Sequence, residues 1–301
     1  MLIQLENEFF KGIADAYGGE LISLKDKNGM EYLWGGDEAY WVGRSPHLFP
    51  IIGTLKDQKI SMNGRSYSME KHGFARNTIY EVVEQTKTTV TFLLKDTKET
   101  KQKYPFTFSF YVTHTLQSNG FTTSYRIVNE GKEEMPFCVG GHTGVRCPIK
   151  EGESFADYQI QFERPVSLKA YRPASDDPIK KISEHTFLEM EDHFTLYYDL
   201  FAEGPIIFNQ ISEHTLKLIN PKSKMGVGYT FEGFPVLALW TLGKKQAPYL
   251  CLEPWHGLPA FEEDGEELRE KPYSMVLRQG EEKTLSFQLR VLQESIKDIW
   301  H

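Results

Sequence analysis

The chain has 301 residues, 40% hydrophobic and 13% aromatic, which is enough apolar material for a sizeable core and excludes a disordered protein. Its 34 basic and 42 acidic residues give a net charge of -8, which disfavours nucleic acid as a partner and suits a small neutral ligand. The sequence shows no apolar stretch near the ~20 residues of a membrane helix, no cysteine pairing pattern and no signal peptide. We therefore expect a soluble cytoplasmic protein, monomeric or homodimeric, without a membrane partner.

Apolar and polar residues alternate along much of the chain, which is the pattern of half-buried strands. Asn-Gly pairs at 28–29, 63–64 and 119–120 each lie between two such segments and predict antiparallel hairpins, because both turn residues tolerate positive φ. The predicted strands, in chain order, are Leu21–Leu24, Met30–Trp34, Ile60–Met62, Arg65–Tyr67, Thr89–Leu94, Phe106–Leu116, Phe121–Val128, Pro205–Asn209, Leu216–Ile219, Val236–Thr241, Tyr249–Leu252, Met275–Leu277 and Thr284–Val291.

Helix is predicted for one short terminal segment, Gln293–Trp300, and no Pro/Gly/Ser-rich linker divides the sequence. Many strands without alternating helices indicate an antiparallel sandwich or barrel rather than a parallel α/β sheet. We therefore expect one all-β domain over residues 1–301.

Four segments place an ionisable residue beside glycine, proline or an aromatic residue, as is common in sites built on a rigid β scaffold. They are Arg44–Gly53, Lys71–Arg76, Gly140–Gly144 and Cys251–Gly257. Taken alone, a histidine next to glycine is more often a turn residue, and a carboxylate at the end of an apolar run is often paired with an arginine. The four segments together are more specific.

In this order, they resemble the aldose 1-epimerase (galactose mutarotase) family, and within it the bacterial branch named after LacX. The matching motifs are Phe49-Pro50-Ile51-Ile52-Gly53, His72-Gly73-Phe74-Ala75-Arg76, Gly140-Gly141-His142 and Glu253-Pro254-Trp255. The resemblance implies a large antiparallel β-sandwich with a sugar site on a concave sheet face, and chemistry that needs no metal or cofactor.

The resemblance also implies roles for individual residues. His142 falls at the general acid, Glu253 at the general base, and His72 at a histidine that hydrogen-bonds the sugar near its ring oxygen. Further sugar contacts are implied for Arg44, Arg76, Asp199 and Trp240. An Asn-Arg segment typical of galactose mutarotases is absent from residues 48–55, where Arg44 is the nearest substitute, so galactose is not implied as the substrate.

Mutarotation itself requires these residue types. A base removes the proton of the anomeric hydroxyl, and an acid protonates the ring oxygen as the C1–O5 bond breaks. A carboxylate and a histidine suit these steps when their pKa values are drawn toward neutrality. We therefore expect His72, His142 and Glu253 to converge on one cleft, with a gap between acid and base that admits a pyranose ring.

Other functions fit less well. The sequence contains no HxH or HExxH pair, which disfavours a metal-dependent isomerase. It contains no GxSxG motif, which disfavours a serine hydrolase. Two alternatives stay open: a hexose-6-phosphate 1-epimerase, with Lys71, Arg76 and Arg146 as candidate phosphate ligands, and a non-catalytic sugar-binding protein.

Overall fold

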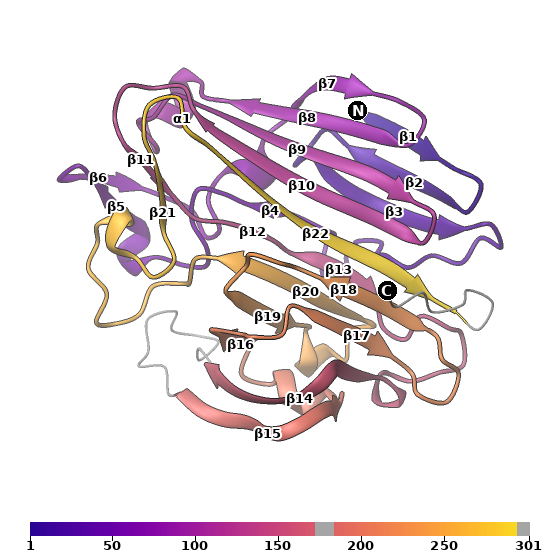
Figure 1. Ribbon diagram of the computed structural model, residues 1–301. Coiled ribbons are helices and arrows are strands. Elements are labelled where there is room, and N and C mark those ends of the chain that lie inside the picture. The colour runs from indigo at the N-terminus through magenta and orange to yellow at the C-terminus, as the bar shows by residue number, and fades with distance from the viewer. Residues whose placement is uncertain (172–183, 294–301) are drawn as a thin grey trace.

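The computed structural model describes residues 1–171 and 184–293, and β-strands dominate both ranges (Figure 1). Most strands belong to one long antiparallel sheet that curls into a β-sandwich, and the all-β prediction is confirmed. In hydrogen-bonded order this sheet contains β4 (His47–Leu48), β12 (Val139–Gly141), β20 (Tyr249–His256), β19 (Val236–Trp240), β16 (Ile206–Asn209), β14 (Gln159–Tyr171), β17 (Thr215–Ile219), β18 (Gly226–Thr230), β22 (Glu282–Leu292), β10 (Gly120–Asn129), β9 (Phe108–Gln117), β8 (Thr89–Lys95) and β7 (Glu81–Gln85). Two further strands join it, β13 (Thr143–Arg146) beside β20 and β15 (Glu184–Thr195) beside β14.

Smaller elements complete the fold. Three small sheets consist of β1 (Leu2–Glu6), β2 (Phe10–Asp15) and β3 (Glu20–Asp26); β5 (Lys59–Met62) and β6 (Arg65–Ser68); and β11 (Met135–Phe137) and β21 (Met275–Leu277). The helical segments are α1 (Lys98–Lys101) and the 3-10 turns η1 (Lys56–Gln58), η2 (Ala75–Asn77), η3 (Phe155–Asp157), η4 (Tyr198–Phe201), η5 (Gly243–Lys245) and η6 (Leu268–Glu270). Across the described ranges, no helix is both long and apolar enough to span a membrane.

Strand alternation predicted the central hairpin well. Buried positions alternate along β9 and β10, and the two strands pair from Gln117–Gly120 to Phe108–Asn129. The turn, however, is Ser118-Asn119 rather than Asn119-Gly120. Gly120 is already in the ladder, where a Cβ would lie 2.0 Å from the Leu289 carbonyl oxygen of β22. The glycine therefore permits a close approach between strands.

The other two Asn-Gly predictions had different outcomes. Asn63-Gly64 joins β5 to β6 with positive φ at both residues, as predicted. The predicted strand Met30–Trp34 is wrong, because this segment makes only isolated bridges. The Glu31 carboxylate accepts the backbone N–H groups of Leu24 at 2.8 Å and Leu33 at 3.0 Å, and the segment keeps only scattered backbone hydrogen bonds to β3 and β13 instead of a continuous ladder.

Several strands lacked a clear sequence signal. The long pair β14 and β15 contains register shifts, and most of β15 is exposed, so alternation is weak there. Short strands such as β4, β12 and β13 were also not predicted. The predicted helix Gln293–Trp300 lies outside the described residues, apart from Gln293.

One large cluster of buried apolar side chains fills the sandwich, and it includes residues of both the small β1–β3 sheet and the long sheet. Gly12 of β2 lies against β9, where an added Cβ would be 3.3 Å from Leu116. This core supports β12, β20 and β19, the strands on which the candidate site is built.

Candidate active site

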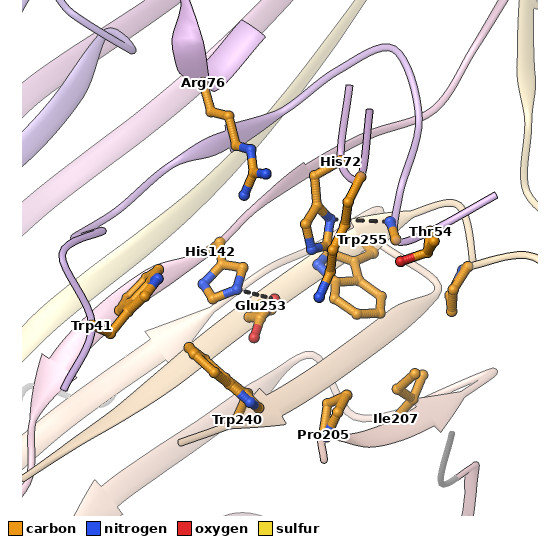
Figure 2. Close-up of a pocket in the computed structure, with 13 residues that line it drawn as sticks. Trp41, Thr54, His72, Arg76, His142, Pro205, Ile207, Trp240, Glu253 and Trp255 are labelled. Atoms are coloured by element: carbon orange, nitrogen blue, oxygen red, sulfur yellow. Dashed lines mark hydrogen bonds and ion pairs between the residues drawn. The ribbon is translucent and has the colours of Figure 1, made fainter. Parts of the chain in front are cut away.

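A cavity of about 210 Å³ is lined by residues of β16, β19 and β20 and by His142, which directly follows β12 (Figure 2). His72, His142 and Glu253 all line it, although they are 70 and 111 residues apart in the sequence. Arg76 and Trp240 line the same cavity. The structure thus brings five of the seven predicted site residues together.

His142 and Glu253 form the centre of the site. The imidazole Nε2 lies 3.1 Å from a carboxylate oxygen of Glu253, and both side chains are at least nine-tenths buried. The prediction that a pyranose ring would fit between His142 and Glu253 is therefore wrong, because the two side chains are in direct contact. Direct contact nevertheless suits the chemistry, because the anomeric hydroxyl and the ring oxygen are both bonded to C1, so their acid and base must lie close together.

Two glycines allow this contact. Gly140 and Gly141 precede His142 in β12, and a Cβ on Gly140 would lie 2.7 Å from the Trp255 ring and 2.9 Å from a carbonyl oxygen of β20. On Gly141 it would lie 2.8 Å from the ring of Phe287. The Gly-Gly-His motif therefore brings the imidazole down onto β20 beside Glu253.

His72 is oriented by its own loop. Its backbone has a φ of 65°, and its N–H donates to the Gly53 carbonyl at 2.8 Å. In return, the Gly53 N–H donates to His72 Nδ1 at 3.0 Å. Because Nδ1 is an acceptor here, the proton of the neutral ring is on Nε2 and is available to a ligand. The His72 and His142 rings lie 5.9 Å apart, edge to face.

Burial shifts the protonation of all three groups. It raises the pKa of Glu253 well above its usual value, and nearby Lys71 opposes this shift. It lowers the pKa of His142 to about 3 and that of His72 well below 6.5, and Lys71 acts in the same direction on both. The two histidines are therefore neutral near pH 7, and the carboxyl group is a stronger base than a solvated glutamate.

The cavity presents hydrogen-bonding groups that have no partner within the described protein. These are Arg76 Nε and His142 Nδ1, and both are buried, whereas the indole of Trp255 interacts with Glu253 and lowers the pKa of that carboxyl group. A buried polar group without a partner is costly, so such groups at a cavity wall point to a polar ligand. Trp240 adds an apolar wall, with its ring 5.6 Å from that of His142.

Two predicted site residues lie elsewhere. The Arg44 guanidinium donates to the Gly35 carbonyl at 3.0 Å, and Arg44 does not line the cavity. Asp199 is exposed in η4 and is also absent from the cavity wall. Both predictions depended on approximate alignment with the family rather than on a motif that matches residue by residue.

Several residues of the cavity wall were not predicted as part of the sugar site, among them Trp41 and Lys71. Trp41 packs against His142 with ring centroids 5.0 Å apart and against Trp240 at 5.3 Å, so the two indoles form an aromatic corner. Lys71 lines the cavity beside the three buried groups. Lys71 directly precedes His72 in the sequence, whereas Trp41 lies outside every recognised motif and carries no comparable signal.

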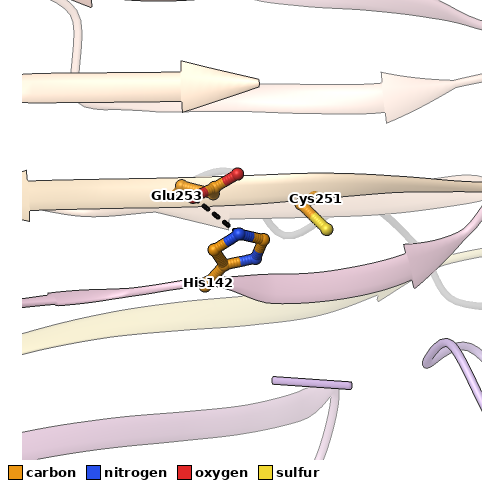
Figure 3. A group of neighbouring side chains, drawn as sticks. All are labelled: His142, Cys251 and Glu253. Atoms are coloured by element: carbon orange, nitrogen blue, oxygen red, sulfur yellow. Dashed lines mark ion pairs between the residues drawn. The ribbon is translucent and has the colours of Figure 1, made fainter. Parts of the chain in front are cut away.

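One set of neighbouring side chains could hold a metal ion. His142, Cys251 and Glu253 each offer one ligand atom, and these atoms all lie within 4.8 Å of one another (Figure 3). All three residues are buried, and burial raises the pKa of the Cys251 thiol well above its usual value.

Comparison with known proteins shows which family this sandwich fold belongs to. A model of the aldose 1-epimerase family matches residues 1–290, so the chain belongs to this family. The family and fold implied by the sequence motifs are thereby confirmed.

Individual relatives indicate which members of the family this chain resembles. The chromosomal and plasmid LacX proteins of Lactococcus lactis subsp. lactis are each 33% identical over 279 residues, which cover 90% of this chain and 93% of theirs. A galactose mutarotase related enzyme from Lactobacillus acidophilus superposes with a TM-score of 0.91 at 29% identity, over 99% of this chain and 100% of that one. A galactose mutarotase-like protein from Lactobacillus casei gives 0.88 at 29% identity, over 97% and 100%.

Proposed function

We propose that this protein is an aldose 1-epimerase that interconverts the α and β anomers of an aldose without a cofactor. The observation that carries the proposal is the contact of 3.1 Å between His142 and Glu253 in a cavity that His72 also lines. Membership of the aldose 1-epimerase family supports a sugar as the substrate.

In the proposed reaction, the His142–Glu253 pair starts with one shared proton, which moves from the carboxyl group to the imidazole across their 3.1 Å contact. Glu253 then accepts the proton of the anomeric hydroxyl, and His142 delivers its proton to the ring oxygen as the C1–O5 bond breaks. The Nε2–H group of His72 donates a hydrogen bond to the sugar near that oxygen. After rotation about C1–C2, the same groups act in reverse and close the ring on the other face. On ring closure, the O5 hydroxyl returns its proton to His142 and Glu253 returns its proton to the anomeric oxygen, so both groups regain their starting state and the cycle is balanced.

The decisive test is polarimetry of freshly dissolved α-aldoses with Glu253→Gln and His142→Asn. Each change removes a proton-transfer group but keeps much of the side-chain volume. We expect kcat to fall by ~10²–10⁴-fold in each variant, or about 3–5 kcal/mol of transition-state stabilisation, while sugar affinity changes far less. The double variant should lose less than the product of the two single losses, because the pair acts as a unit.

Asp199→Asn is the matched control, since it neutralises a carboxylate outside the cavity and should leave turnover unchanged. If the wild-type protein binds sugars yet leaves every anomer at its uncatalysed rate, it is a binding protein, and the roles given to His142 and Glu253 are wrong.

A phosphorylated aldose is a second candidate substrate, because two cationic side chains, Lys71 and Arg76, line the cavity. Arg146, the third residue considered for this role, is exposed and absent from the cavity wall. Hexose 6-phosphates therefore belong on the same polarimetry panel. A kcat/KM at least tenfold higher for the phosphate ester than for the parent hexose would identify the phosphorylated sugar as the substrate class.

A further inference from the structure

Cys251 has no part in the proposed reaction, yet it lies beside the reacting groups. It is two residues before Glu253 in β20, so both side chains lie on the same face of that strand. The adjacent β13 pairs with β20 through Thr143 and Leu252, which places His142 over the same face. The three ligand atoms are within 4.8 Å of one another, although the cysteine and the histidine are 109 residues apart in the sequence (Figure 3).

The three groups match the ligand preference of a particular class of metal ion. One imidazole nitrogen, one sulfur and one carboxylate oxygen are the ligand types of Zn²⁺, which binds them at about 2.0–2.3 Å. Ligand atoms around a tetrahedral ion of this size lie roughly 3–4 Å apart. The His142–Glu253 distance of 3.1 Å is already near this range.

A second observation favours a ligand at this position. His142 Nδ1 is buried and has no hydrogen-bond partner in the described structure, while Nε2 faces Glu253. Hydrogen bonds at both ring nitrogens would have to break before an imidazole could rotate to bind a metal ion. The imidazole of His142 is held only at Nε2, so it can rotate toward an ion at little cost in free energy.

We propose that His142, Cys251 and Glu253 form a binding site for a thiophilic divalent cation such as Zn²⁺, and that the bound ion inhibits the enzyme. His142 and Glu253 line the cavity and Cys251 lies buried behind them, so an ion held by all three would sit at the edge of the space that the sugar would occupy. The ion takes the lone pairs that the acid and the base need for proton transfer. The inhibition rests on the proposed function, whereas the binding of the ion does not.

The charges around the site bear on its affinity. Lys71 and Arg76 line the same cavity and oppose the entry of a cation. Metal binding, however, displaces the proton of the thiol and any proton on the carboxyl group. One divalent ion can thus replace two protons, which leaves the total charge of the cavity nearly unchanged.

The site is tested directly with Co²⁺ as a spectroscopic probe on the full-length, metal-free protein. Coordination by Cys251 predicts a thiolate-to-cobalt charge-transfer band with one equivalent of Co²⁺. The band should be lost in Cys251→Ser and in His142→Asn, and it should persist in Cys147→Ser, which alters another fully buried thiol. If the wild-type protein gives no thiolate band, or if Cys251→Ser keeps it, the site does not exist.

Inhibition is measured separately, with Zn²⁺ titrated into the polarimetric assay. Zn²⁺ should inhibit competitively with the sugar, and a chelator should restore full activity. Cys251→Ser should keep its basal rate, while the Zn²⁺ concentration for half inhibition rises about tenfold or more. Equal sensitivity of Cys251→Ser and wild type would overturn the proposal.

Two further outcomes remain informative. If Cys251→Ser fails to fold, Cys251→Ala is used instead, because alanine leaves no polar atom in the buried position. If no sugar is epimerised by the wild type, the cobalt spectra still decide the metal site, so the two proposals fail independently.

Discussion

Arg44 and Arg76 carry the same guanidinium group, but they lie in different surroundings. Arg76 lines the cavity, and its buried Nε has no partner within the described protein. Arg44 donates to the Gly35 carbonyl and accepts, through its own carbonyl, the N–H of Gly144. Arg76 is therefore placed to bind a ligand, whereas Arg44 holds its loop against β13 through hydrogen bonds.

This difference predicts separate effects for two alanine variants. Arg76→Ala should raise KM by about 10-fold or more with a smaller change in kcat, because a hydrogen bond to a charged group contributes about 1.5–3 kcal/mol. Arg44→Ala should leave KM and kcat of the folded fraction unchanged and should lower thermal stability. Steady-state kinetics and thermal denaturation of both variants make the comparison. A raised KM in Arg44→Ala with normal stability would contradict the assignment.

At the scale of elements, the loop from residue 70 to 75 positions His72 through its backbone. His72 and Gly73 both have positive φ, 65° and 73°. The Gly73 N–H donates to the Glu70 carbonyl at 2.9 Å, and a Cβ on Gly73 would lie 2.2 Å from the Phe49 carbonyl oxygen. The second motif therefore requires glycine because the chain turns against the first motif, and this packing orients the histidine.

Gly73→Ala should accordingly cost about 2–5 kcal/mol of unfolding free energy, from the left-handed backbone and the steric overlap together. It should also lower kcat in the folded fraction, because His72 must shift. Gly29→Ala is the matched control, since Gly29 has a φ of 85° but nothing within 4 Å of the added Cβ. That variant should cost about 1–2 kcal/mol and leave kinetics unchanged. Urea denaturation and polarimetry distinguish the two, and equal costs would show that the contact with Phe49 is relaxed cheaply.

For the molecule as a whole, two buried histidines join segments that are distant in the sequence. His47 of β4 and His114 of β9 both direct Nε2 at the Gly19 carbonyl, at 2.9 and 2.7 Å. Their Nδ1 atoms lie 2.8 Å from the hydroxyl of Tyr125 and 2.9 Å from that of Thr123, so each neutral ring is satisfied at both nitrogens. Burial lowers the pKa of His47 to about 3 and that of His114 to about 4.

Stability should therefore fall in mild acid. From pH 6.5 downward the unfolded histidines bind protons that the folded ones do not, until the pH reaches their folded pKa values. Each histidine should reduce the unfolding free energy by about 1.4 kcal/mol per pH unit in this window and have no effect above pH 7. In His114→Gln, the slope of stability against pH between pH 6.5 and 4.5 should be smaller by about that amount.

Glu20→Gln provides a control of opposite sign. Burial raises the pKa of Glu20 to about 7, so the folded state holds a proton between pH 7 and 4.5 that the unfolded state lacks. Its removal should make the loss of stability in acid steeper. Urea denaturation across this pH range measures all three proteins, and unchanged slopes in both variants would rule out this account.

Many of the strands and the residue types of the candidate site could be predicted from the sequence. Alternation predicted β9 and β10, and about half of the strands of the long sheet were predicted in all, because a half-buried strand needs apolar residues at every second position. The ordered motifs indicated the family, and with it the roles expected for His72, His142 and Glu253.

Which side chains share the cavity depends on the tertiary structure. Exposed or irregular strands such as β15 carry little alternation, and Met30–Trp34 makes only isolated bridges to β3 and β13. Arg44 and Asp199 lie outside the cavity, whereas Trp41 and Lys71 lie within it. The physical reason is that pairing register and loop packing bring distant residues onto one face, and neither is encoded in any short stretch of sequence. Cys251 shows the same effect, since only the pairing of β13 with β20 places its sulfur beside His142.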